Sequence, residues 1–408
     1  MDATTLAERH TLEPVTDRIA LLDVLRGFAI LGIVLFNIEA FSGWAFLSPE
    51  KAATLPGAGA DAALNYLLVA LIEGKFYSLF SLLFGVGFAV IIQRAEARGA
   101  RVTPILLRRY VVLFFIGLVH SALIWFGDIL TLYSLLGFVL LACRGLSNRA
   151  LVRFSIGLLL LPITLYGLGL ALQPQPTPGD GGGLPPALID AIQAFQSGNY
   201  SQIVAGNITI AAFNWLRRLI LMFYPRVFGM FLLGFALSRM GVFQAPERHA
   251  GLIRSFARYG LLVGLPASIL YSALDRHAGM MPLTMNGFIR TICESIGTPL
   301  LCLGYVAWIT MLFQAARWQS ILLWIAPVGR MALSNYLLQS VVGVLLFYGI
   351  GGGLFMRVSF ATSVGIAVAI FAAQVVLSRL YFKSFSQGPV EALWRRLTYG
   401  RRAQGASA

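Results

Sequence analysis

Charged residues are scarce in this 408-residue sequence, where Asp, Glu, Lys and Arg together make up 12% of the chain and hydrophobic residues make up 58%. An ordinary soluble domain has roughly 25% charged and about 45–50% apolar residues. This composition therefore excludes a soluble enzyme. Apolar runs of about 20 residues, the length of a helix that crosses a bilayer, recur along the chain. They predict an all-α, polytopic integral membrane protein.

Cysteine, histidine and acidic residues are also few. The three cysteines have no C-x-x-C spacing, and the four histidines form no pattern of metal ligands, so we expect neither disulfides, nor a metal site, nor a tightly bound cofactor. Lys and Arg number 31 against 17 Asp and Glu, a net charge of +14. In a polytopic membrane protein this excess is expected in cytoplasmic loops, so we expect no nucleic-acid partner.

The apolar runs predict about ten transmembrane helices. The first run starts at Ile19 and lacks the small-residue cleavage site of a signal peptide, so it is expected to remain as a span. Cytoplasmic loops are enriched in Lys and Arg, and their distribution here places both termini in the cytoplasm. The predicted spans are residues 19–41, 62–93, 105–126, 129–143, 150–172, 219–240, 253–274, 285–312, 320–349 and 358–382, with a break in the second at Glu73-Gly74-Lys75.

One long segment without Lys or Arg, residues 173–206, divides the chain and predicts a partly helical extracytoplasmic loop. In the tail, Pro389 suits the first position of a short helix, and Trp394 is expected to anchor that helix at the membrane interface. The predicted organisation is a cytoplasmic segment 1–18, a five-helix membrane bundle 19–172, the loop 173–206, a second five-helix bundle 207–382 and a cytoplasmic amphipathic tail 383–408.

Polar residues inside apolar spans are expensive and usually face a bundle interior or a partner. At about 100° per residue, Asp23, Arg26 and Asn37 fall on one face of the first span, whereas Glu39 points away. Asp23 and Arg26 are spaced i,i+3, so they either pair within the helix or contact an anionic cofactor. The same face would carry Asn37 toward the outer side of the membrane.

Several other spans place a polar residue at a similar depth when a rise of about 1.5 Å per residue is assumed. Such convergence predicts a buried hydrophilic cavity. The alternative is structural: amides forming interhelical hydrogen bonds, acidic and basic side chains closing a helix break, or an arginine neutralising a buried acid. The residues assigned to this layer are Glu73, Lys75, Arg226, Glu294, Asn335 and Gln339.

His120 is the only histidine within a predicted span. The carboxylate of Asp128 follows it at the outer turn and could orient its ring. Histidine is the side chain best suited to exchange protons near neutral pH, so His120 is a candidate general base. The alternative is a packing histidine with satisfied hydrogen bonds.

Five ordered motifs extend over nearly the whole chain. They are LDVLRG at 22–27 with NI at 37–38, KFYSLFSLLFG at 75–85, GLVH at 117–120 with WFGDIL at 125–130, GRMALSNY at 329–336, and GPVEALW at 388–394 with LTYG at 397–400. Together they resemble the YeiB family of bacterial inner-membrane proteins, which implies a multi-pass protein of the bacterial inner membrane. The Asp-x-x-Arg-Gly pattern of the first span, followed by Asn, is also similar to the transmembrane acyltransferase superfamily that includes heparan-glucosaminide N-acetyltransferase.

Members of that superfamily transfer an acyl group from cytoplasmic acyl-coenzyme A to an acceptor on the other side of the membrane. The resemblance implies that Asp23 and Arg26 bind the coenzyme. His120, oriented by Asp128, would be the general base, and Asn37 would stabilise the oxyanion. The acceptor would be a glycan, a lipid headgroup or a small amine.

A small-solute transporter is the alternative hypothesis. The same polar cavity would then be the binding site, and His120, Glu73 and Glu294 would couple transport to protons. The sequence contains no convincing internal repeat of the kind common in transporters, which favours the acyltransferase hypothesis.

Overall fold

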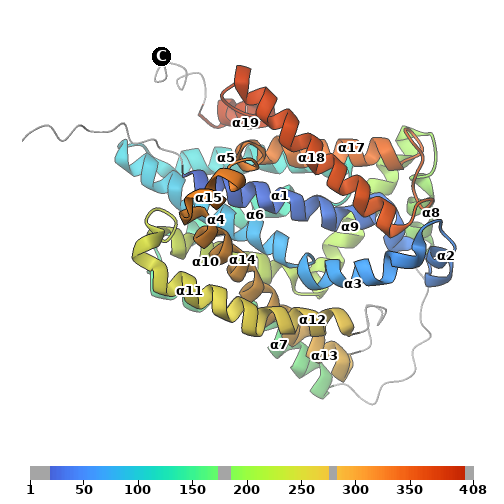
Figure 1. The fold of residues 1–408 in the computed structure, drawn as a ribbon, viewed down its shortest axis with the longest axis horizontal. Helices are drawn as coiled ribbons and strands as arrows, with labels where there is room; N and C mark the ends of the chain where they lie inside the picture. Colours follow the sequence, from blue (N-terminus) through green and yellow to red (C-terminus); the bar gives the residue numbers. More distant parts are fainter. Residues whose placement is uncertain (1–18, 173–184, 275–282, 400–408) are drawn as a thin grey trace, which may run out of the picture.

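The computed structural model describes residues 19–172, 185–274 and 283–399, and every regular element in these ranges is helical. Long helices lie side by side along one direction, with short helices at both ends (Figure 1). The all-helical prediction is confirmed for the described part of the chain. The predicted segment 1–18 and the start of the predicted loop 173–206 lie outside the described residues.

Helix α1 (Ala20–Phe41) occupies the centre of the molecule and has most of its side chains buried. It packs against α16 (Ala326–Arg330), α17 (Ala332–Phe347) and α18 (Phe360–Ser384). All four helices contribute to one apolar core, or contact it, because the sequence places large aliphatic and aromatic residues around α1.

The second predicted span is broken, as the sequence indicated. Helix α3 (Asp61–Leu71) ends before Gly74, and α4 (Lys75–Ala97) begins after it. Gly74 has φ +83°, a left-handed conformation that other residues rarely adopt, so glycine permits the break. Helix α4 then packs along α10 (Phe223–Arg239).

A second broken helix was not predicted. Helix α9 (Tyr200–Ile220) begins inside the expected loop 173–206 and meets α10 at a bend of 73°. The prediction missed its first half because Gln202, Asn207 and Asn214 lower the hydropathy there. The loop itself contains α8 (Pro186–Ala194).

The predicted span 320–349 is also interrupted. It is divided into α15 (Ala316–Leu322), α16 and α17, because Pro327 lies at the start of a new helix rather than inside a continuous one. The other main helices are α5 (Val102–Val119), α6 (Leu130–Ala142), α7 (Asn148–Leu172), α11 (Ala250–Tyr259), α12 (Leu265–Ala273), α13 (Met285–Ile292), α14 (Thr298–Gln314) and α19 (Pro389–Tyr399); α2 (Pro49–Ala53) is short.

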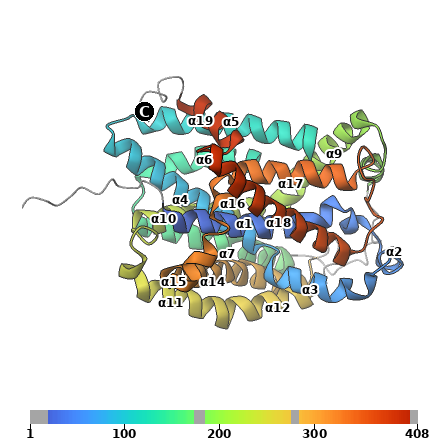
Figure 2. The ribbon, with the colours of Figure 1, turned by 45° about the horizontal axis from the view of Figure 1, so that its top comes forward.

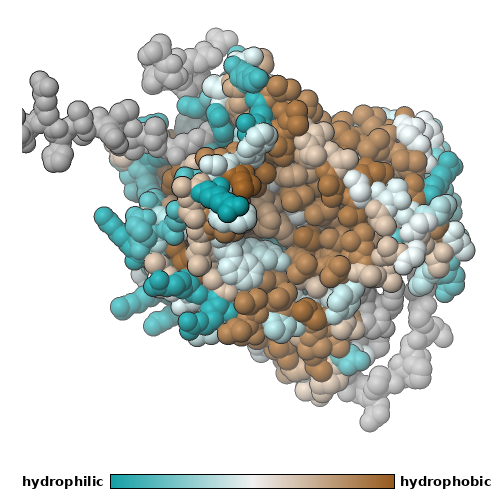
Figure 3. Space-filling view, in the orientation of Figure 1, coloured by the Kyte–Doolittle hydropathy of each residue, from teal (hydrophilic) through white to brown (hydrophobic). Residues whose placement is uncertain are grey.

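Among the described residues, six helices are long and apolar enough to cross a membrane, or seven if the bent pair α9 and α10 forms one span. A broad hydrophobic belt separates hydrophilic surfaces in Figure 3. Large apolar side chains such as Phe154 and Leu377 are exposed in the structure, as expected where lipid replaces water. Helices of the two predicted bundles, 19–172 and 207–382, pack together, since α1 contacts α16 and α4 contacts α10.

Candidate functional site

His120 lies where α5 ends. The helix continues for one widened π-helical turn, η3 (His120–Ile124), and the chain then becomes extended at Trp125. Such π-helical turns are rare and frequently occur at functional sites. The His120 side chain is 1% exposed, so its imidazole is almost completely buried inside the protein.

Both nitrogens of the His120 ring have hydrogen-bond partners. Nδ1 lies 3.0 Å from Oδ1 of Asp128, and Nε2 lies 2.9 Å from Oγ of Ser340. The pairing of His120 with Asp128 is therefore as the sequence predicted. Because a carboxylate can only accept, Nδ1 is the protonated nitrogen when the ring is neutral, and Nε2 is left with its lone pair toward Ser340.

The Asp128 carboxylate is itself fixed by the first turn of α6. The backbone N–H of Leu130 donates to Oδ1 at 3.1 Å, and that of Thr131 donates to Oδ2 at 2.8 Å. These donors are among the otherwise unpaired amides at a helix N-terminus, where negative charge is favoured. These bonds fix the Asp128 carboxylate beside Nδ1 of His120 and thereby orient the imidazole.

Helix α9 holds the turn that carries His120. Asn207 donates from Nδ2 to the carbonyls of Ala122 and Ile124, at 3.4 and 3.3 Å. The Tyr200 hydroxyl donates to the Leu123 carbonyl at 2.6 Å. These bonds satisfy the carbonyls at the end of the π-helical turn. Neither side chain was identified from the sequence, because Tyr200 lies in the expected loop 173–206 and Asn207 lies between that loop and the next predicted span at 219–240.

A cavity of about 300 Å³ lies between α1, α4, α5, α6 and the segment that joins α16 to α17. Its volume is at the lower end of the range of small-molecule sites. Most of its walls are apolar, whereas three half-buried arginines, Arg26, Arg109 and Arg330, line it together with Glu391 and Trp394 of α19. The predicted polar layer does not form the wall of this cavity, since Arg26 is the only predicted site residue in its lining.

Tyr336 connects this cavity with His120. Its side chain contributes to the cavity wall, and its ring centroid lies 5.1 Å from that of His120. The Tyr336 hydroxyl donates to the carbonyl of Gly127 at 3.3 Å, immediately before Asp128. One aromatic side chain therefore contacts the imidazole and faces the apolar space.

Helix α19 contributes Glu391 and Trp394 to the cavity wall, and Figure 2 shows it crossing α5. The Trp394 indole donates to the carbonyl of Arg109 at 2.9 Å, and the Arg109 guanidinium lies 3.5 Å from the centre of the Trp394 ring. Glu391 accepts from the backbone N–H of Leu333 and Ser334 at the start of α17. Trp394 thus contacts Arg109 of α5 and is partly exposed, and its role as a membrane-interface anchor stays a prediction.

Asp23 and Arg26 form the intrahelical pair that their spacing predicts. Nη1 of Arg26 lies 3.3 Å from Oδ1 of Asp23, with the Arg26 side chain 31% exposed and Asp23 almost fully buried. Arg26 also lines the cavity. The structural alternative is thus realised, and Asp23 additionally positions a cavity arginine.

Asn335 and Gln339 join helices instead of lining the cavity. Asn335 donates to the Val328 carbonyl and to Ser378, both at 3.1 Å. Gln339 donates to Gln374 at 2.8 Å, and Gln374 donates to the Asn335 carbonyl at 2.8 Å. This confirms the alternative of interhelical hydrogen bonds. Asn37 is buried on α1, and among the described residues no hydrogen bond connects it with His120.

The remaining predicted polar residues form a separate cluster at the breaks in α3–α4 and α13–α14. Nη1 of Arg226 lies 2.8 Å from Oε1 of Glu294, which confirms the predicted pair. The Tyr271 hydroxyl donates to Glu73 at 3.0 Å and accepts from Arg290 at 3.1 Å. Lys75 is fully buried and donates to the Val69 carbonyl at 3.0 Å.

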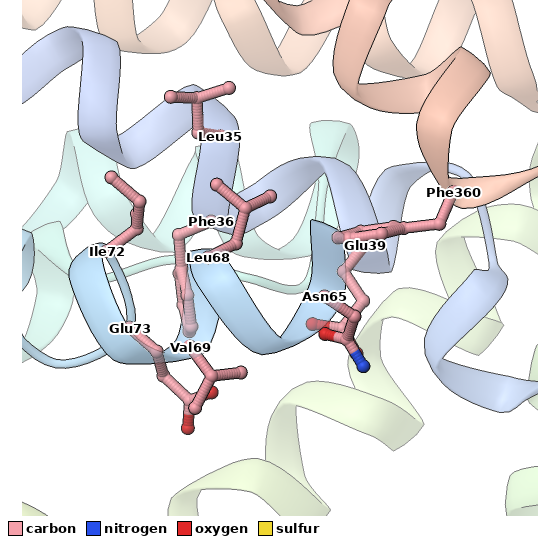
Figure 4. A pocket seen from close by; sticks show the side chains of 9 residues that line it. All are labelled: Leu35, Phe36, Glu39, Asn65, Leu68, Val69, Ile72, Glu73 and Phe360. Atoms are coloured by element: carbon pink, nitrogen blue, oxygen red, sulfur yellow. The ribbon is translucent and has the colours of Figure 1, made fainter. Parts of the chain in front are cut away.

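Figure 4 shows a small pocket between α1 and α3, lined by Glu39, Asn65 and Glu73 among apolar side chains. Its volume of about 10 Å³ is enough for a single water molecule. It is too small to hold a substrate.

Comparison with known proteins gives the family. A family model described as "Protein of unknown function (DUF418)" matches residues 237–401. The uncharacterized protein YxaH of Bacillus subtilis is 34% identical over 413 residues, covering 95% of this chain and 96% of YxaH. The chain belongs to the YeiB family. The uncharacterized protein YeiB of Escherichia coli is itself 29% identical over 391 residues, covering 94% of this chain and 96% of YeiB.

In this YeiB-family protein the two sides of the histidine site come from distant parts of the chain. The matched family model spans α17 and α19, and therefore Tyr336, Ser340 and Glu391, whereas His120 and Asp128 precede it. Ser340, Tyr336 and Glu391 were missed because serine, tyrosine and glutamate are unremarkable near a span. The only available signal was their spacing, since Tyr336 and Ser340 are four residues apart and share a helix face.

Proposed function

We propose that this YeiB-family protein is a transmembrane acyltransferase, which moves an acyl group from cytoplasmic acyl-coenzyme A to an acceptor hydroxyl or amine at the extracytoplasmic side. The observation that carries the proposal is the position of Tyr336. This residue packs against His120 and also lines an apolar cavity whose lining includes three arginines. A candidate base and a cavity thus meet at one residue.

The cavity suits an amphiphilic donor. Guanidinium groups bind phosphate oxygens in bidentate fashion, so Arg26, Arg109 and Arg330 would hold the phosphates of coenzyme A. The apolar walls would receive the acyl chain and the end of the pantetheine arm. Arg109 and His120 are eleven residues apart on α5 and η3, and the helical rise separates them by about 16 Å. An extended thioester arm can span that distance.

The base would act through Nε2 of His120. Asp128 fixes the tautomer and would stabilise the imidazolium that forms when the acceptor loses its proton. Asn37 is proposed to donate to the developing oxyanion, since it is buried on α1. The acceptor would be a glycan, a lipid headgroup or a small amine.

The orientation follows from the basic residues. Arg94, Arg98 and Arg101 lie at the junction of α4 and α5, which is on the same side as α19. The positive-inside rule assigns such a side to the cytoplasm. We therefore propose about ten spans in a bacterial inner membrane, with both termini in the cytoplasm and the arginines of the cavity accessible to cytoplasmic coenzyme A.

Ligand binding to the purified protein tests this proposal. Acetyl- and longer acyl-coenzyme A should raise the unfolding temperature in detergent, because a ligand that binds only the folded state stabilises it. Free coenzyme A and ATP serve as controls. Arg26→Ala should reduce the shift, whereas Lys51→Ala, which removes an exposed cation of α2 outside the cavity, should not. Absence of any shift at millimolar acyl-coenzyme A would refute the proposal.

A small-solute transporter is the second candidate, favoured by the bend of 73° between α9 and α10 and by the charged cluster beside it. Discontinuous helices with buried charges are common at transporter binding sites. This function would require Glu294 and Glu73 and would be indifferent to coenzyme A. The acyltransferase should tolerate Glu294→Gln and lose activity in His120→Ala.

A further inference from the structure

Ser340 is the third member of a hydrogen-bonded series of side chains that also contains Asp128 and His120. Its Oγ lies on the Nε2 side of His120, opposite Asp128, at 2.9 Å. The side chain is 1% exposed and sits on α17, one helical turn beyond Tyr336. The His120 imidazole is thus arranged as a general base would be. Asp128 orients it from one side, and the Ser340 hydroxyl faces it on the other.

A buried serine hydroxyl on a helix can satisfy its hydrogen bonding without an imidazole partner. Its alternative partner is the Tyr336 carbonyl, four residues earlier at 3.4 Å. Ser363 on α18 satisfies its buried hydroxyl with such a bond alone, to the Ser359 carbonyl at 3.0 Å. The Ser340 hydroxyl is instead placed closer to Nε2, which is the lone-pair nitrogen of the neutral ring.

We infer that Ser340 is a catalytic residue that carries the acyl group covalently, an inference that rests on the proposed acyl transfer. In the first half-reaction Oγ attacks the thioester carbonyl carbon. The ester C–O bond forms, the C–S bond breaks, and His120 passes the Oγ proton to the departing sulfur of coenzyme A. In the second, an acceptor hydroxyl or amine attacks acyl-Ser340, and its proton returns through His120 to Oγ as the ester bond breaks.

Tyr336 gives the thioester a route to this hydroxyl. It lies on the same helix face as Ser340 and about 6 Å away along the axis, by the rise of four residues. Because Tyr336 lines the cavity and packs against His120, the proposed route requires its ring to rotate and so connect the apolar space with Nε2 and Oγ. The acyl group would then pass from the arginine-bearing cavity to the far side of the imidazole.

Isotope exchange tests the covalent step. The full-length protein in detergent is incubated with acetyl-coenzyme A and isotopically labelled free coenzyme A, without acceptor. A covalent intermediate transfers label into acetyl-coenzyme A, and acid-quenched digestion locates an acetyl group on the peptide that contains Ser340. We expect Ser340→Ala to lower the exchange by about 10³-fold or more, as the loss of a nucleophile does. Ser363→Ala, the matched buried serine, should stay within about threefold of the parent.

Ser340→Cys separates chemistry from folding. It should retain an acyl adduct, now a thioester that neutral hydroxylamine removes, and its unfolding temperature should match that of Ser363→Ala. Undiminished exchange in Ser340→Ala, an adduct on His120, or acyl transfer by the parent protein without exchange would overturn the inference while leaving acyl transfer intact. A parent protein that neither binds nor consumes acyl-coenzyme A would overturn the proposed function and this inference together.

Discussion

Glu391 of α19 caps the start of α17, so Glu391→Ala should weaken the docking of α19 on α17. Glu391 accepts from the backbone N–H of Leu333 at 2.8 Å and of Ser334 at 3.1 Å, and its second oxygen accepts from the Ser334 hydroxyl. A hydrogen bond to a charged group contributes about 1.5–3 kcal/mol, and loss of an N-cap costs about 1 kcal/mol. These groups are half-buried, so water can replace part of the interaction. We therefore expect the free energy of docking α19 on α17 to fall by about 2 kcal/mol.

Hydrogen exchange of the protein in detergent measures this loss. About 2 kcal/mol corresponds to roughly 30-fold in an equilibrium constant. Amides of α19 that exchange when the helix undocks should therefore exchange about 30-fold faster in Glu391→Ala, and those of the first turn of α17 should follow. Glu391→Gln should fall between, since it keeps an acceptor without the charge. Glu96→Ala, which removes an exposed carboxylate near the end of α4, is the control. Exchange of α19 within about twofold of the parent would refute the capping role.

Three further perturbations test other parts of the structure. Arg226→Met and Glu294→Gln should each lower the free energy of unfolding by about 2–3 kcal/mol, because the charge of the partner stays buried. The double variant should be less destabilised than the sum of the two. Additive changes in the free energy of unfolding would show that the two side chains do not interact. Asp128→Asn should lower the rate of coenzyme A release by about 10³-fold or more, because the histidine tautomer is lost. Its unfolding temperature should fall only modestly, since the amide oxygen still accepts from one of the two backbone N–H groups. An unchanged rate would exclude His120 as an oriented base. Gly329→Ala should lower the unfolding temperature by overpacking worth about 1–3 kcal/mol, because its Cβ would meet the backbone oxygen of Asp23; a parental unfolding temperature would show that α16 can shift.

Three kinds of feature could be predicted from the sequence: continuous apolar helices, a helix break flanked by charged residues, and a pair of complementary side chains close together in the chain. Uninterrupted apolar runs gave α1, α7 and α18 with nearly correct bounds, because in lipid a helix satisfies all its backbone groups internally. The break at Gly74 was predictable since charged residues flank it. The pair His120 and Asp128 was predictable because its members are eight residues apart and complementary.

Long-range polar contacts could not be predicted in the same way. Helix α9 was missed because its polar residues reduce hydropathy, yet Asn207 is fully buried against the carbonyls of η3. Ser340 lies 220 positions from His120, and nothing in its immediate sequence distinguishes it from other buried serines. The roles of such residues are set by the packing of helices and not by periodicity.

The separation of the polar clusters has a physical cause. Several residues were predicted to share a similar depth, but in a membrane interior each polar group must find a partner nearby, so a similar depth can lead to pairing and not to one cavity. Arg226 with Glu294 and Gln339 with Gln374 satisfy one another between helices. His120 differs, because its neighbour Tyr336 also borders an apolar space. The histidine site therefore differs from the other buried polar groups because its hydrogen-bonded side chains lie next to a cavity, and not because of its depth.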